Sequence, residues 1–148
     1  MTLRELQLHI CEILNADETL LQGRCRAFAE DALDARLMPE PALHAGAGGV
    51  ALVVRTPSAR LAGALPAGAG IPVAATLAVV CLEIPAVNRA QEPFVSAMGA
   101  AERVAHLLAG PTRSFDRFES DLIDGKEQRF FVFTAYFQAH FTHTKPQG

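Results

Sequence analysis

The stretch QRFFVFTAYFQAHFT, from Gln128 to Thr142, decides the fold. One set of alternate positions is apolar throughout, which is the period of two that indicates a strand with one face against a core. The intervening positions are apolar at the start and polar towards the end, so the second face should be covered only early in the strand. The apolar set is Phe131, Phe133, Ala135, Phe137, Ala139 and Phe141.

This strand is unusually long. At about 3.3 Å per residue it would span about 50 Å, whereas most strands end before about ten residues. We therefore expect a bulge, strong curling, or an end that projects from the domain. A projecting apolar strand offers a surface to another chain, so the stretch predicts that copies of the protein associate.

The residues before this stretch predict a hairpin. Asp124-Gly125 is a strong hairpin signal. A loop of two or of four residues places Phe118 and Leu122 on the apolar face of the long strand. Asp116 would fall on the same face, so the pairing should end or bulge near it.

Two further strands precede the hairpin. Val50 to Thr56 is short and rich in β-branched residues, and Pro57 ends it. Ile71 to Ile84 is continuously apolar in its second half, as in a central strand covered on both faces. The Gly, Ala and Pro-rich segment from Pro57 to Gly70 is longer than a usual connection. It either contains a helical turn or is a mobile functional loop.

Two helices are expected near the N-terminus. Thr2 and Glu5 form a capping box that starts the first. Asp17 is the expected N-cap of a second helix that reaches Leu37 and is ended by Pro39 and Pro41. The apolar stripe of the second helix would consist of Leu21, Cys25, Phe28, Ala32 and Ala35.

A third helix has the clearest amphipathic pattern. Its apolar positions recur at helical spacing from Phe94 to Leu108, and Gly110-Pro111 supplies the stop. The order helix, helix, strand, loop, strand, helix, hairpin predicts a single domain over residues 1–148. We expect an α+β fold with a mostly antiparallel sheet, helices packed on one face and a C-terminal β-hairpin.

Composition excludes some function classes. The net charge is −3, and the 13 Lys and Arg residues are scattered, which argues against a nucleic-acid binder. The N-terminus lacks the apolar core of a signal peptide. Glycines and prolines interrupt the weakly polar run from Leu61 to Leu82, so no membrane helix is expected there. We expect a protein that is made in the cytosol.

No catalytic centre can be assigned from the sequence. Cys11, Cys25 and Cys81 lie within apolar patterns and have no CxxC spacing, so we expect core thiols. The serines lack the GxSxG context of a nucleophile. A small enzyme or ligand-binding domain that depends on Cys or His side chains remains the alternative. The serines considered are Ser58, Ser96, Ser114 and Ser120.

No metal or cofactor is predicted either. His140 and His143 lie three residues apart in a strand, so they point to opposite faces rather than to one ion. Gly46 to Ala51 fits a loose GxGxxA pattern, but a strand should precede a dinucleotide loop and a helix should follow it. Here the order is the reverse.

One polar cluster stands out at the end of a buried strand. Glu83 interrupts an apolar run, and Asn88 and Arg89 open the loop that follows Pro85. These side chains either fix the loop through hydrogen bonds or form a contact between subunits. An Arg at a strand end suits bidentate pairing with the carboxylate of a neighbour.

Three features occur in order: the strand VVCLEIPAVNR, the helix AMGAAERVAHLLAG and the two phenylalanine-rich strands that follow. In these features the chain resembles the tail terminator, or tail completion, proteins of long-tailed phages and prophages. The resemblance covers roughly residues 71 to 142. The N-terminal helix TLRELQLHICEIL and the chain length fit the same pattern.

This resemblance implies a structural protein without catalytic activity. It implies a homo-oligomeric ring, expected to be a hexamer, that caps the tail tube and ends its polymerisation. The ring would also provide the joining surface for a head-tail connector or neck protein, and a connector protein is the alternative within this class. It implies assembly in the host cytoplasm and a place in the virion tail. Glu83, Asn88 and Arg89 are the expected interface residues.

Overall fold

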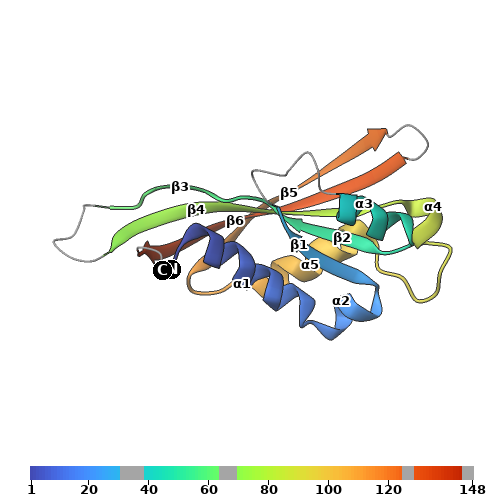
Figure 1. Cartoon of the computed structure of the whole chain (residues 1–148), viewed down its shortest axis with the longest axis horizontal. Coiled ribbons are helices and arrows are strands. Elements are labelled where there is room, and N and C mark those ends of the chain that lie inside the picture. Colours follow the sequence, from blue (N-terminus) through green and yellow to red (C-terminus); the bar gives the residue numbers. More distant parts are fainter. Residues whose placement is uncertain (31–38, 64–69, 125–128, 145–148) are drawn as a thin grey trace.

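The computed structural model describes residues 1–30, 39–63, 70–124 and 129–144. Its centre is a six-stranded sheet in the order β1-β2-β4-β6-β5, with β3 paired to β4 beside that path (Figure 1). The predicted α+β class, with a mostly antiparallel sheet and a C-terminal hairpin, is confirmed. The strands are β1 (Cys25–Ala29), β2 (Val50–Val54), β3 (Ser58–Leu61), β4 (Ile71–Glu83), β5 (Arg113–Asp124) and β6 (Arg129–His143). The helices are α1 (Leu3–Asn15), α2 (Glu18–Gln22), α3 (Pro39–Gly46), α4 (Pro85–Asn88) and α5 (Ala97–Leu108).

Side-chain caps begin both long helices. The Thr2 hydroxyl accepts from the Glu5 backbone N–H at 3.1 Å, and the Glu5 carboxylate accepts from the Thr2 N–H at 3.3 Å. This confirms the capping box. Helix α5 begins at Ala97 rather than at Phe94, because the Ser96 hydroxyl caps it by accepting from the Gly99 N–H at 3.0 Å.

The main core lies between the sheet and helices α1 and α5, which cover one face (Figure 1). Alanines on α5 bring this helix close to β4 and β6, as its composition predicts. The short α3 lies on the other side of the sheet, where the Phe28 and His44 rings meet edge to face at 6.0 Å. The buried residues of α1 and α5 include Leu6, Ile10, Leu14, Ala97, Ala100, Ala101, Val104 and Leu108.

The second predicted helix is wrong beyond its first turns. It ends at Gln22 in α2, and Arg24 adopts a positive φ of 58°. The chain then forms β1, which pairs in parallel with β2. Alternating burial from Cys25 to Ala27 and the two hydrogen bonds between the Asn15 side chain and the Ala27 backbone favour the strand. Residues 31–37 of the predicted helix lie outside the described residues.

Two other segments differ from the sequence prediction. Pro39 and Pro41, expected to follow the end of a helix, lie in the first turn of α3, where a missing N–H costs little. The segment from Pro57 to Gly70 contains strand β3, which the sequence did not predict. Its residues 64–69 lie outside the described residues.

The predicted hairpin register is confirmed. Phe118 pairs with Ala135 and Leu122 with Phe131, which places both on the apolar face of β6. The register shifts between Phe115 and Arg117, so Asp116 is the extra residue of a β-bulge. The bulge lies where the sequence predicts a break in pairing.

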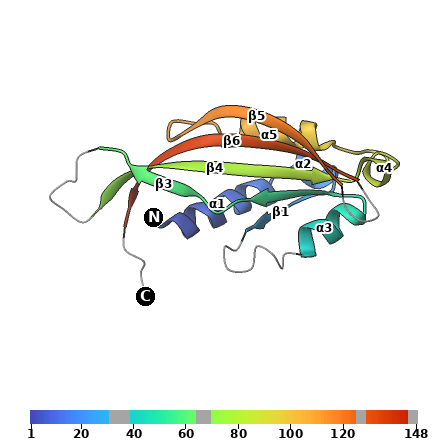
Figure 2. The same cartoon turned by 90° about the horizontal axis from the view of Figure 1, so that it is seen from above.

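The expected uncovered strand is β5 rather than β6. Strand β6 pairs with β4 from Phe131 to His143 and with β5 on its other side, so both of its edges are covered. Strand β5 is the outermost strand (Figure 2) and is exposed over nearly its whole length. Of the three expectations for the long strand, a bulge, strong curling or a projecting end, the bulge is present in its pairing with β5, and the open edge of the hairpin belongs to β5.

Candidate interaction surface

The Glu83 side chain is fully buried at the end of β4 and accepts three hydrogen bonds. Its Oε2 accepts from Asn88 Nδ2 at 2.6 Å, and its Oε1 accepts from Arg89 Nη2 at 2.9 Å. The same Oε1 accepts from the backbone N–H of Ala97 at 3.0 Å. A carboxylate is stabilised there by the unpaired N–H groups and dipole of the first turn of α5. Glu83 thus ties the end of β4 to α4 and α5.

Asn88 extends this network. Its Nδ2 also donates to the Val95 carbonyl at 2.9 Å, while its buried Oδ1 has no hydrogen-bond partner among the described residues. Two of the three predicted site residues are therefore buried, and all three are brought together. Of the two alternatives, hydrogen bonds that fix the loop or a contact between subunits, the structure contains the hydrogen bonds of the first. The Arg89 side chain is 47% exposed, and its contact with a neighbouring subunit stays a prediction.

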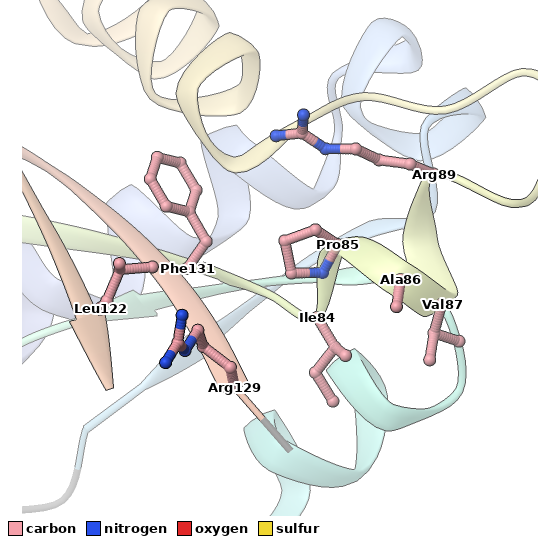
Figure 3. A pocket seen from close by; sticks show the side chains of 8 residues that line it. All are labelled: Ile84, Pro85, Ala86, Val87, Arg89, Leu122, Arg129 and Phe131. Carbon is pink, nitrogen blue, oxygen red and sulfur yellow. The ribbon is translucent and has the colours of Figure 1, made fainter. Parts of the chain in front are cut away.

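A hollow of about 720 Å³ lies beside this cluster, between α4 and the part of the hairpin where β5 ends and β6 begins (Figure 3). Figure 3 shows Leu122 and the Phe131 ring on one side of it, Pro85 and Ala86 on the other, and Arg89 and Arg129 at its margins. Both arginines have an acidic partner, since Arg89 bonds Glu83 and the Arg129 Nε donates to Asp124 at 2.8 Å. The lining is otherwise apolar and consists of Ile84, Pro85, Ala86, Val87, Leu122 and Phe131.

A row of phenylalanine rings connects the core to this hollow. The ring centroids of Phe137 and Phe115 lie 5.9 Å apart, those of Phe115 and Phe118 4.5 Å, and those of Phe118 and Phe133 5.5 Å. The row ends at Phe131, 6.2 Å from Phe133. Phe137 is fully buried, whereas Phe115 and Phe118 are exposed. We call the set Phe115, Phe118, Leu122, Phe131 and Phe133 the aromatic face.

A second hollow, of about 340 Å³, lies between α5 and β5 at the other end of the aromatic face. Phe115 and Phe118 form one wall, and Glu102, Ala105 and His106 of α5 form the other. The aromatic face therefore has an open hollow at each end.

The opposite face of β5 is polar. The Arg117 guanidinium lies 4.1 Å from the Tyr136 ring centroid and bonds Asp116 at 2.6 Å and Glu119 at 2.9 Å. Hydrogen bonds from Arg117 and then from Tyr136 lower the pKa of Glu119. Burial, and then the Glu119 carboxylate, raise the pKa of Tyr136. Such charged groups on an edge strand discourage unselective pairing.

All three cysteines are buried, as predicted. Burial raises the pKa of the Cys11 thiol to about 11 and that of Cys25 to about 12. Burial also raises the pKa of Cys81 well above its usual value. A protonated thiol is a poor nucleophile, so these positions fit structural roles.

Within the described residues, the structure places neither the histidines nor the GxGxxA pattern at Gly46 in an arrangement that would bind a metal or a dinucleotide. His140 pairs with Ala74 and His143 with Ile71 along β6, and no group of three His, Cys, Asp or Glu suited to a metal occurs among residues 1–30, 39–63, 70–124 and 129–144. Helix α3 precedes the Gly46 pattern and strand β2 follows it. Within those same ranges, no helix is long and apolar enough to cross a membrane.

Sequence reasoning missed two features of this region. Arg129 reaches the hollow only because the hairpin register, in which it pairs with Asp124, places it on the same face as Leu122 and Phe131. Arg103 on α5 bonds both carboxylate oxygens of Asp17, at 2.7 and 3.1 Å, although the residues lie 86 positions apart. The hairpin register offers a signal for the first, but no local signal links the second pair.

A scan against protein-family models and a search of curated proteins find no match for this chain.

Proposed function

We propose that this chain is a structural protein of a phage or prophage tail. It forms a homo-oligomeric ring, a hexamer, on the end of the tail tube, ends tube polymerisation and provides the joining surface for a head or neck protein. Assembly takes place in the host cytoplasm, and the ring remains in the virion tail. The resemblance of residues 71 to 142 to tail terminator proteins gives this proposal its specific content.

The observation that carries the proposal is strand β5. It is the outermost strand of the sheet, extends over 12 residues and is exposed along most of that length. Its outer backbone N–H and C=O groups have no strand partner within the described part of the chain. Unpaired edge groups can pair with another chain, and the charges on β5 restrict that pairing to a matching partner. A ring of identical subunits needs one surface to meet a different surface of its neighbour.

The ring is tested by mass and by imaging. We expect light scattering to give the mass of six chains at high protein concentration, and negative-stain images to show rings. Added in excess to polymerising tail tube protein from the same genome, the protein should give short tubes with a ring at one end. A monomer at all concentrations, with no effect on tube length, would contradict the proposal.

A pair of proline variants tests the edge itself. Neighbouring residues of an edge strand point their N–H groups alternately inward and outward, and proline removes the N–H. Of Ser120→Pro and Asp121→Pro, one should unfold the hairpin and the other should keep the fold and lose the ring. Circular dichroism identifies the folded variant. Full ring formation by that variant would exclude β5 as the ring contact.

Nothing in the site geometry favours the alternative of a Cys- or His-dependent enzyme. The thiols are buried with raised pKa values. The hollow at Arg89 and Arg129 is lined by apolar groups and arginines. Slow labelling of the folded protein by a thiol reagent supports the structural proposal, and one fast thiol would support the alternative.

A further inference from the structure

We propose that the aromatic face is a docking site for one amphipathic helix of a different polypeptide, with acidic side chains at the helix end that reaches Arg89 and Arg129. Helices α1 and α5 cover the sheet from β1 to β6, but most of β5 has no helix over it (Figures 1 and 2). This proposal goes beyond the ring and does not depend on it.

The uncovered surface has the length of a helix. The ring contacts from Phe115 to Phe131 join the two hollows into one apolar track beside α5. Phe115 and Leu122 pair with Phe137 and Phe131, which lie six positions apart on β6, a distance of about 20 Å at strand spacing. A helix of about 14 residues covers this length. Laid beside α5, it would complete the helical layer over the hairpin and bury the exposed rings.

Charge gives the track a direction. Arg89 and Arg129 border the hollow at one end, and no acidic residue lines it among the residues that the structure describes. Each arginine uses one guanidinium nitrogen for its acidic partner, Glu83 or Asp124, and its other nitrogens make no hydrogen bond to the described residues. Glu102 and His106 border the hollow at the other end. The arginine end favours acidic side chains and the negative end of a helix dipole. The docked helix is therefore expected to place its C-terminal turn, rich in Asp or Glu, at Arg89 and Arg129.

The occupant is a different polypeptide because the described part of this chain has no suitable helix to offer. Among the described residues, α1 and α5 are long enough, but both use their apolar faces in the core of their own subunit. Helices α2, α3 and α4 have eight residues or fewer. In a tail ring, the partner would be a protein of the tube or of the neck.

The test selects helices from a displayed library of amphipathic 16-residue peptides (a length based on about 1.5 Å per residue), with the full-length protein as bait. Binding of the enriched peptides is measured by fluorescence anisotropy. We expect apolar residues at i, i+3, i+4 and i+7 and acidic residues in the last turn. Replacing those acids by Lys should weaken binding to the unmodified protein about tenfold.

Two neighbouring residues on opposite faces supply a matched control. Leu122 is 56% exposed on the aromatic face, and Ile123 is 49% exposed on the other face. Leu122→Asp should weaken peptide binding at least about tenfold, whereas Ile123→Asp should leave it unchanged. Arg129→Glu should reverse the preference, so that the Lys-ended peptides bind better than the acidic ones.

Three results would overturn the proposal. The first is that the library gives no enriched helix, and the second is that the enriched peptides bind the Leu122→Asp protein equally well. The third is that Leu122→Asp lowers the mass of the self-assembled protein, which would make a second copy the occupant. The outcome is separable from that of the ring. If the protein is monomeric but binds these helices, only the proposed ring function is contradicted. If it forms the ring but binds none of these helices, only this inference is contradicted.

Discussion

Phe137 and Phe118 lie in one hairpin and in one row of aromatic rings, but in opposite environments. Phe137 is fully buried beneath α5, whereas Phe118 is exposed on β5. Both side chains lie on the same face of the hairpin, although Arg117 and Glu119 flank Phe118 and uncharged residues flank Phe137. The helical layer also differs, because it covers β6 and leaves most of β5 open. An alternating aromatic strand thus predicts an apolar face, while the neighbouring helices decide whether that face is core or contact surface.

The largest contrast should appear in thiol reactivity. Leu122→Cys places a thiol on the open surface, while the native cysteines are buried and their pKa values are raised. In the monomeric state, the new thiol should react with a disulfide reagent at pH 8 more than about 100-fold faster than the native ones. Denaturant should remove the difference. Equal rates in the folded protein would show that the core is open.

Truncating the two phenylalanines compares the regions directly. Phe137→Ala leaves a cavity in the core and should lower the free energy of unfolding by about 3–5 kcal/mol. Phe118→Ala should lower it by less than about 1 kcal/mol, because its ring is already in contact with solvent. Urea unfolding of both variants at one protein concentration measures this difference. Equal losses would mean that the aromatic face is part of the core.

The Glu83 cluster anchors the covered region at its edge. Glu83→Ala leaves the Asn88 side chain and the Ala97 N–H without their acceptor, and should cost about 2–3 kcal/mol. The exposed Glu119, in the uncovered strand, is the matched control, and Glu119→Ala should give no measurable change. If Glu83→Ala retains full stability but loses the ring, the cluster acts at the subunit interface rather than in the loop.

The smallest effect should come from the Asp17–Arg103 pair, which lies on the covered side. Hydrogen bonds from Arg103 lower the pKa of Asp17 below 3.8. Because the folded pKa is depressed, the pair stabilises the fold above pH 3.8 and loses this effect as pH falls through the folded pKa. Asp17→Asn should therefore make the free energy of unfolding less dependent on pH below about pH 4. An unchanged pH dependence would contradict the shift.

Local chemistry allowed much of the fold to be predicted. The Thr2 capping box, the α5 periodicity and the Asp124-Gly125 turn each depend on residues close in sequence, and the hairpin register followed from them. Strand β1 could not be predicted in this way. Its five residues also fit a helical stripe, and only pairing with β2 and the bonds from Asn15 decide between the two.

The candidate site was predicted in part, because some of its residues lie close together in the sequence. An acidic residue at the end of an apolar strand marked Glu83, and the nearby polar residues marked its partners. The hollow needed tertiary information, because Leu122 and Arg129 reach α4 only through the hairpin. The open edge of the sheet could not be placed from the sequence pattern either, since that pattern does not reveal that β4 and β5 flank β6.

The bulge at Asp116 makes β5 tolerant of one specific change in length. Asp116 is the residue that the register of β5 against β6 skips. Deletion of Asp116 would make Phe115 and Arg117 neighbours in a regular β5–β6 pairing, with both side chains still on their present faces. Loss of any other single residue within β5 would turn part of the strand over. Natural length variation in this strand should therefore concentrate at one position.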